Sequence, residues 1–142
     1  MIYCDASLMV ASLATEPLSD IARKFLSGLA DEKLVVSPWV STEVASALAM
    51  KMRQGVWSET QRNTLLDTWR GIAAALKVEL VEQEHFHLAE TLVNSGRRGL
   101  RAGDALHLAI ARCAGFALAT LDRDLADAAE SVGVEVALRP PA

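Results

Sequence analysis

Five short apolar segments recur along the chain, and stretches with helical spacing of their apolar residues lie between them. The segments span residues 2–5, 34–37, 78–81, 116–120 and 134–138. They are apolar at successive rather than alternate positions, as expected of strands covered on both faces of a parallel sheet. Strands that alternate with helices favour a three-layer α/β/α fold. We therefore expect one α/β domain over residues 1–142, a length that suits one hydrophobic core.

The intervening segments carry recognisable helix ends. Apolar spacing predicts helices over 18–29, 40–53, 58–76, 84–94, 104–114 and 123–132, with a further helix after residue 7. Ser7 is expected to cap that first helix, and Asp122 to cap the last one. Ser58 and Gln61 fit a capping box, whereas Gly115 is expected to end the helix that starts at Asp104.

The composition restricts the class of protein. Hydrophobic residues make up 51 % of the chain and charged residues 23 %, which indicates a globular domain rather than a disordered chain. Charges interrupt every apolar stretch well short of the roughly 20 residues that a membrane span needs. The N-terminus has no signal-peptide pattern, so we expect a cytoplasmic protein. Cys4 and Cys113 are then expected to be buried thiols rather than a disulfide.

Four acidic residues occupy positions where an open parallel sheet forms its site. Asp5 ends the first expected strand, and Asp122 lies two residues past the fourth. Glu43 lies in the first turns of the helix that follows the second strand, and Asp104 opens the helix that leads into the fourth. Because sites in such sheets form beyond the carboxyl ends of the strands, we expect these four side chains to converge.

Converging carboxylates repel one another, and a bound cation relieves that repulsion. Hard divalent ions such as Mg²⁺ take oxygen ligands and keep waters that a substrate phosphate can replace. A metal-activated water can attack a phosphodiester, and a second metal can steady the leaving oxygen. No zinc spacing, nucleotide-binding loop or serine-hydrolase elbow occurs in the chain. The pattern therefore indicates phosphodiester hydrolysis with a hard divalent ion such as Mg²⁺.

Each of the four acids also has a structural alternative. Asp5, Asp104 and Asp122 lie where helices are expected to begin, so each could be an N-cap. Glu43 could be a solvated helical residue, although its neighbours are apolar. The structural interpretation requires four independent coincidences, and the joint pattern therefore favours a catalytic site.

Further polar residues accompany the four acids. Ser7 and Thr120 could hydrogen-bond the carboxylates and orient them, or could serve only in capping and strand packing. Asp124 is either an additional metal or water ligand or a partner of the helix dipole. His107 lies one turn after the third acid and could face the site, although a buried structural role is favoured.

The two other histidines, His85 and His87, are expected to be solvated helix residues. Arg97, Arg98 and Arg101 form a basic, glycine-containing loop that suits RNA phosphate contacts, with a plain solvated loop as the alternative. The net charge of −4 argues by itself against nucleic-acid binding. Without the four candidate ligands, however, the 14 basic residues would balance the remainder of the 18 acidic ones.

Each of the four acids lies within a short motif. The motifs are Tyr-Cys-Asp-Ala-Ser at 3–7, Ser-Pro-Trp-Val-Ser-Thr-Glu-Val at 37–44, Leu-Arg-Ala-Gly-Asp-Ala-Leu-His-Leu-Ala at 100–109 and Ala-Thr-Leu-Asp-Arg-Asp-Leu at 119–125. In this order and spacing they resemble the motifs of PIN domains, and specifically of VapC-type toxins from bacterial toxin–antitoxin pairs. The resemblance extends over residues 2–138, and none of the four acids is missing.

The resemblance implies a five-stranded parallel sheet in the order 3-2-1-4-5. It implies an Mg²⁺- or Mn²⁺-dependent endoribonuclease, the toxin of a type II toxin–antitoxin system, with Asp5, Glu43, Asp104 and Asp122 as catalytic and metal-binding residues. It also implies an RNA substrate, a homodimer and inhibition by a cognate antitoxin protein, with no membrane association.

Two other classes of function remain open. One is a non-catalytic PIN-fold binding module, which the complete set of four acids argues against. The other is a different Mg²⁺-dependent phosphoryl-transfer enzyme, such as a phosphatase or a receiver-like domain. A receiver would need a lysine near the end of the last strand, and no lysine follows Lys77.

The predicted helices near the N-terminus carry more apolar residues than one small sheet requires. These residues are Leu18, Phe25, Leu26, Leu48, Met50 and Met52. Since methionine-rich surfaces adapt to partner helices, we expect a groove that binds an antitoxin segment, with ordinary core packing as the alternative.

Overall fold

The computed structural model describes residues 1–96 and 99–142. Its centre is a parallel sheet in the order β3-β2-β1-β4-β5, which confirms the predicted fold class and strand order. The strands are β1 (Ile2–Cys4), β2 (Leu34–Val36), β3 (Lys77–Val78), β4 (Ala117–Ala119) and β5 (Val136–Leu138). They are shorter than predicted, and β3 is exposed because it lies at the edge of the sheet.

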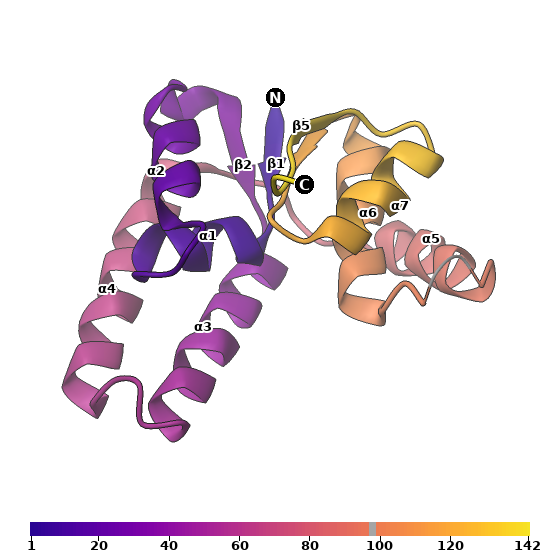
Figure 1. Cartoon of the computed structure of the whole chain (residues 1–142). Coiled ribbons are helices and arrows are strands. Elements are labelled where there is room, and N and C mark those ends of the chain that lie inside the picture. Colours follow the sequence, from indigo (N-terminus) through magenta and orange to yellow (C-terminus); the bar gives the residue numbers. More distant parts are fainter. Residues whose placement is uncertain (97–98) are drawn as a thin grey trace.

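Two groups of helices lie on opposite sides of this sheet (Figure 1). The first group is α1 (Ala6–Leu13), α2 (Ser19–Ser27), α3 (Pro38–Arg53) and α4 (Glu59–Ala75). The second is α5 (Gln83–Asn94), α6 (Ala102–Ala114) and α7 (Arg123–Ser131). A short 3₁₀ turn, η1 (Asp31–Lys33), precedes β2. None of the helices in the described part of the chain is both long and apolar enough to cross a membrane.

Several helix ends follow the local sequence as predicted. Ser58 and Gln61 form the expected capping box at the start of α4. Asp122 caps α7 by accepting a hydrogen bond from the Leu125 N–H at 3.1 Å. Gly115 ends α6 in the left-handed conformation, with φ of 70°, which costs an L-residue more than it costs glycine.

Two predicted helix starts are wrong. Asp5, not Ser7, caps α1, because the Asp5 carboxylate directly follows the extended strand and accepts from the Leu8 N–H at 3.1 Å. Helix α6 begins at Ala102, so Asp104 lies in its first turn instead of capping it. In both cases the helix takes in one or two more residues at its N-terminus than its apolar spacing indicated.

The central strands lie in the hydrophobic core. Tyr3 pairs in register with Val35 of β2 and with Leu118 of β4, and all three side chains are fully buried. Cys4 is buried beside them, as predicted. Cys113 is exposed, contrary to prediction, because it lies in the last turn of α6, beyond the buried stretch of that helix.

The prediction that His85 is solvated is also wrong. This side chain is buried at the start of α5, and its Nδ1 accepts a hydrogen bond from the Glu82 N–H at 2.9 Å. The ring therefore supplies a backbone donor at the helix start with an acceptor. His87 is exposed, as predicted.

Candidate functional site

The strand order reverses at β1. The chain runs outward from β1 to β2 and β3, and later places β4 and β5 on the other side of β1. Connections that leave neighbouring strands on opposite faces open a crevice at the carboxyl edge of the sheet. Asp5 follows β1 directly, and Thr120 and Asp122 follow β4 at the same edge. Two of the four motifs therefore meet at this crevice.

The Asp5 carboxylate is buried and surrounded by hydrogen-bond donors. The Ser7 hydroxyl lies 2.7 Å from Oδ1 and 2.9 Å from Oδ2, and the Thr120 hydroxyl donates to Oδ2 at 2.7 Å. The hydrogen bonds anticipated from Ser7 and Thr120 are thus present. Burial raises the pKa of Asp5 above its ordinary value, while His107 and these hydrogen bonds act in the opposite direction. The orientation of this carboxylate is fixed from several sides.

Both hydroxyl groups are themselves held by the segment after β4. Ser7 Oγ accepts a hydrogen bond from the Leu121 N–H, and Thr120 Oγ1 accepts one from the Asp122 N–H, each at 2.9 Å. The hydroxyls can therefore direct their hydrogens toward Asp5. This arrangement links the first motif of the chain to the fourth.

Arg101 lies beside two of the acids. Its Nε is 3.5 Å from Oδ2 of Asp104, and its Nη2 is 3.6 Å from Oδ2 of Asp122. Burial, and then the charge of Asp122, raise the pKa of Asp104, whereas Arg101 lowers it. The two carboxylates thus share one guanidinium as a counter-charge.

Glu43 extends from α3 to α6, where its Oε2 makes a short hydrogen bond with Nε2 of His107. The His107 ring is buried, as expected, and its Nδ1 lies 2.9 Å from the Tyr3 hydroxyl. The charge of Glu43 also contributes to the raised pKa of Asp104. The direct contact between His107 and Glu43 was not predicted, because the spacing of His107 from Asp104 indicated only that His107 could face the site.

Gly103 allows the close approach of Glu43 to α6. A Cβ atom at this position would lie 2.8 Å from Oε1 of Glu43 and 3.4 Å from the ring of Trp39. The Trp39 indole N–H also donates to the Gly103 carbonyl at 3.3 Å. The sequence analysis missed both residues, and the glycine directly before Asp104 was the signal that could have identified one of them.

The remaining candidate residues lie around this centre. Asp124 is exposed in the first turn of α7, and the Arg101 side chain is largely exposed. The candidate RNA-binding residues Arg97 and Arg98 lie outside the residues that the structure describes.

As they stand, the side chains of residues 1–96 and 99–142 include no group of three His, Cys, Asp or Glu close enough to hold a metal ion. Arg101 lies against Asp104 and Asp122, and Glu43 turns toward His107. The donor set still fits a hard divalent cation, because the four acids offer only oxygen ligands and two of them already face a cationic group.

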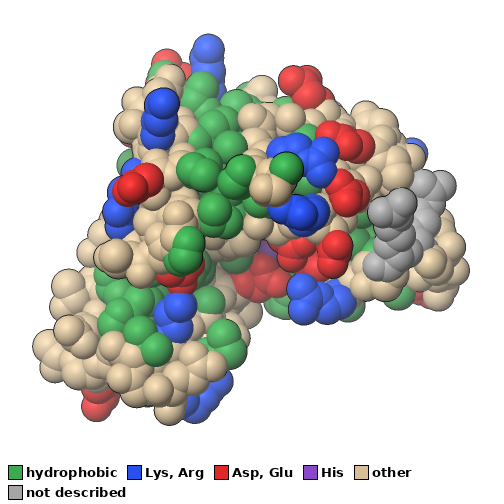
Figure 2. Space-filling view, viewed as in Figure 1, with side chains coloured by type: hydrophobic (Ala, Val, Ile, Leu, Met, Phe, Trp, Pro, Cys, Tyr) green, Lys and Arg blue, Asp and Glu red, His purple; other side chains and the backbone are tan. Residues whose placement is uncertain are grey.

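A groove of about 870 Å³ lies between α1 and α3, and Glu43 is the one of the four acids that lines it. Its walls include Val10, Leu18, Ala47 and Met50, and it ends near Glu43 and Arg101. Figure 2 shows acidic side chains gathered in the hollow of the molecule, with basic side chains beside them. Of the apolar residues predicted to line a groove, Leu48 instead lies in the core, and Phe25 and Leu26 pack against that core.

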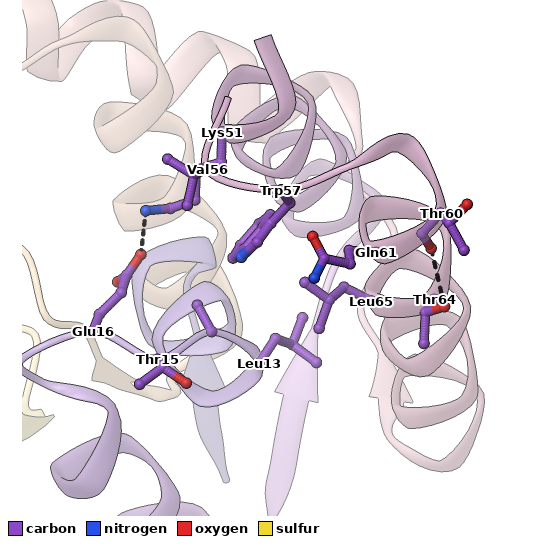
Figure 3. A pocket seen from close by; sticks show the side chains of 11 residues that line it. Leu13, Thr15, Glu16, Lys51, Val56, Trp57, Thr60, Gln61, Thr64 and Leu65 are labelled. Carbon is purple, nitrogen blue, oxygen red and sulfur yellow. Dashed lines mark hydrogen bonds and ion pairs between the residues drawn. The ribbon is translucent and has the colours of Figure 1, made fainter. Parts of the chain in front are cut away.

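A second hollow, of about 390 Å³, adjoins the groove beyond an ion pair between Glu16 and Lys51 at 2.7 Å (Figure 3). Trp57, Leu13 and Leu65 supply much of its apolar lining. The Lys51 ammonium lies 5.6 Å from the centre of the Trp57 ring. The groove and this hollow therefore share one charged pair as a common wall.

Comparisons with known proteins find solved structures with a similar fold. VapC20 of Mycobacterium tuberculosis, a toxin that cleaves the sarcin-ricin loop, superimposes with a TM-score of 0.72 at 18% identity, over 94% of this chain and 96% of that one. FitAcB of Neisseria gonorrhoeae superimposes with a TM-score of 0.76 at 18% identity, over 96% of each chain. A toxin–antitoxin complex from Klebsiella pneumoniae superimposes with a TM-score of 0.66 at 15% identity, over 89% of this chain and 91% of that one.

At these identities the structural neighbours show a shared fold. A comparison with curated protein sequences finds no match. The sequence model of the PIN domain, however, matches residues 2–131, which include all four acidic motifs. This chain therefore belongs to the PIN domain family.

Proposed function

We propose that the chain, as one domain over residues 1–142, is a metal-dependent endoribonuclease and the toxin of a type II toxin–antitoxin pair. Asp5, Glu43, Asp104 and Asp122 would hold Mg²⁺ or Mn²⁺. The observation that carries the proposal is the set of contacts that joins the four motifs: Thr120 links Asp5 to the backbone of Asp122, Arg101 pairs with Asp104 and Asp122, and the charge of Glu43 acts on Asp104. Membership of the PIN domain family supports it, because PIN-domain nucleases generally use divalent metals.

A divalent ion at these carboxylates would supply the positive charge that activates water and stabilises the charge developing on the phosphodiester. Asp5 is suited to a fixed ligand position, because Ser7 and Thr120 orient its carboxylate. Asp104 and Asp122 would exchange the Arg101 guanidinium for the metal ion. Arg101, which is largely exposed, would then be free to contact an RNA phosphate.

The proposed partner is an antitoxin whose segment lies in the groove between α1 and α3. The apolar walls suit such a segment, and the inner end of the groove would bring it to Glu43 and Arg101. Among the structural neighbours are FitAB bound to a DNA fragment and VapBC2 of Rickettsia felis bound to a fragment of its promoter. An RNA substrate would place the protein in the cytoplasm.

We place the proposed homodimer contact on another apolar surface, between α5 and the start of α6. Phe86 and Val93 are exposed there, beside a hollow of about 440 Å³ that Trp39 and Leu106 also line. Exposed apolar patches of this kind often mark protein interfaces. Measurement of the molar mass in solution for the parent and for Phe86→Ser tests this placement.

The function is tested with purified protein and pooled cellular RNA, in Mg²⁺ or Mn²⁺ and in excess EDTA. We expect cleavage only with metal, and loss of cleavage in Asp122→Asn. Asp67→Asn is the matched control, because Asp67 is exposed on α4 and pairs with the exposed Arg70. Equal cleavage in EDTA would contradict the metal mechanism, and intact RNA under all conditions would favour a binding module.

The toxin assignment has a separate test. Expression of the chain should slow growth of the host, and co-expression of the small open reading frame adjacent to its gene should relieve the effect. Growth at the normal rate during expression of folded protein would contradict this assignment. Release of phosphate from small phosphate esters, with RNA left intact, would instead support the phosphatase alternative.

A further inference from the structure

A chain of hydrogen bonds runs from the core to the candidate site. Ser37 Oγ lies 2.8 Å from the Tyr3 hydroxyl, which lies 2.9 Å from Nδ1 of His107, and His107 Nε2 contacts Oε2 of Glu43. The first three side chains are buried, whereas Glu43 is partly exposed at the site. These hydrogen bonds thus connect β1, α3 and α6 through polar atoms.

The chemistry of the two ends determines the direction of the donors. A carboxylate can only accept, so Nε2 of His107 must carry hydrogen to bond Glu43. Nδ1 of a neutral ring is then an acceptor, and the Tyr3 O–H is the group that faces it. A tyrosine hydroxyl carries its hydrogen at neutral pH, so Tyr3 can donate to this acceptor. The Ser37 hydroxyl can donate to Tyr3, because Ser37 Oγ already accepts from the Val40 N–H at 3.3 Å.

The opposite tautomer, with the ring hydrogen on Nδ1, does not fit a neutral His107 beside an ionised Glu43. If Nδ1 carried the hydrogen and donated to Tyr3, Nε2 and the carboxylate oxygen would face each other as two acceptors. Such a contact is repulsive and leaves a buried polar atom unpaired. Within the described residues, no buried side-chain nitrogen or oxygen lacks a hydrogen-bond partner.

We propose that Tyr3 and His107 are positioning residues, in which Tyr3 holds His107 as the Nε2–H tautomer and His107 thereby orients the Glu43 carboxylate for metal binding. Only the metal-binding part of this inference rests on the proposed function. The position of Glu43 is further restricted by Gly103, whose missing Cβ leaves the space that Oε1 occupies. Outer partners of this type commonly set the orientation of metal ligands.

The first experiment measures tautomers by ¹⁵N NMR of the imidazole nitrogens in the metal-free protein. We expect His107 to be the Nε2–H tautomer in the parent. In Tyr3→Phe the Nδ1 acceptor loses its donor, so its ¹⁵N resonance should move and the fraction of the Nε2–H tautomer should fall. His85 is the internal control, because its Nδ1 accepts from the backbone N–H of Glu82 in both proteins. An unchanged His107 spectrum in Tyr3→Phe would overturn the role of Tyr3.

The second experiment measures Mn²⁺ affinity by titration calorimetry for a matched pair of variants. His107→Gln places an amide near the former Nε2 and can still donate to Glu43, whereas His107→Asn places it near Nδ1 and cannot reach. We expect His107→Asn to bind Mn²⁺ about tenfold to a hundredfold more weakly than the parent, with much of the affinity restored in His107→Gln. His85→Gln should bind like the parent.

Equal Mn²⁺ affinity in the parent and in folded His107→Asn would overturn the positioning role. If the His107 variants fail to fold, as melting curves would reveal, Tyr3→Phe decides in their place, with a loss of affinity supporting the proposal and parental affinity opposing it. If the parent binds no Mn²⁺, the proposed function fails. The NMR result would still decide whether Tyr3 sets the tautomer.

Discussion

The Thr120 hydroxyl donates a 2.7 Å hydrogen bond to the Asp5 carboxylate across 115 positions of sequence. The same oxygen accepts the N–H of Asp122, so one side chain links the ends of β1 and β4. The backbone of Asp122 is thereby held next to the side chain that binds the Asp5 carboxylate.

Thr120→Val, which keeps the shape and removes the hydroxyl, should destabilise the protein by about 1–3 kcal/mol. The buried Asp5 carboxylate loses a donor, and the Asp122 N–H loses its acceptor. Thr120→Ser retains the hydroxyl and should cost less. Urea unfolding of both variants measures the difference, and equal losses for Val and Ser would show that packing rather than hydrogen bonding stabilises this position.

Gly103→Ala should destabilise the protein and weaken metal binding, because the added Cβ would lie 2.8 Å from Oε1 of Glu43. Gly71→Ala is the matched control within α4, where a Cβ would meet nothing within 4 Å. In that control the free energy of unfolding should rise by about 0.4–1 kcal/mol, because alanine reduces the conformational freedom of the unfolded chain. Thermal unfolding gives the sign for each variant, and a gain in both would contradict the close contact of Gly103 with Glu43.

Asp104→Asn should change the pH dependence of stability in the metal-free protein. The raised pKa of Asp104 means that the folded protein binds this proton more tightly than the unfolded chain does. The carboxyl therefore lowers stability as the pH rises from its ordinary pKa to the raised one, and the cost persists at higher pH. At pH values below the ordinary pKa, Asp104 is protonated in both states and does not lower the stability.

Asp104→Asn should accordingly be at least as stable as the parent at pH 7 in EDTA, with this advantage disappearing at low pH. Urea unfolding as a function of pH measures the effect. A variant that is less stable than the parent by the same amount at every pH would instead indicate loss of a structural hydrogen bond. Asp67→Asn, at an exposed site on α4, controls for the change in net charge.

Mg²⁺ should raise the melting temperature of the parent, because an ion that binds only the folded state stabilises it by mass action. At a hundred times the Kd the gain is about 2.7 kcal/mol. Asp104→Asn should respond less, since one proposed ligand has lost its charge. Calorimetry over a series of Mg²⁺ concentrations distinguishes this from a salt effect if NaCl of equal ionic strength is the reference. Equal shifts in parent and variant would exclude Asp104 as a ligand.

Arg101→Ala should weaken RNA binding more than it weakens metal binding. Its side chain is largely exposed, so the loss of its pairs with Asp104 and Asp122 should cost less than about 1 kcal/mol of stability. Removal of a competing cation leaves these carboxylates free for metal. Arg62→Ala, at a partly exposed position of α4, is the control. Normal affinity for RNA in Arg101→Ala would contradict the proposed phosphate contact.

The sequence by itself determined the features that depend on neighbouring residues. The alternation of apolar strands with helices indicated a parallel sheet, and the four motifs indicated the strand order through their family resemblance. The capping box of Ser58 with Gln61 and the cap at Asp122 were predictable because each joins atoms three residues apart. The positions of the acids after strands pointed to one edge of the sheet, where the structure places Asp5 directly after β1 and Asp122 shortly after β4.

Only the tertiary structure decided which side chains surround these acids. Glu43 meets His107 across 64 positions, and His107 meets Tyr3 across 104. Local spacing cannot predict such contacts, because they depend on how α3 and α6 pack at the end of β1. The burial of His85 and the exposure of Cys113 were mispredicted for a related reason. Helix periodicity indicates which residues share a face, but the packing of other elements determines which end of that face reaches solvent.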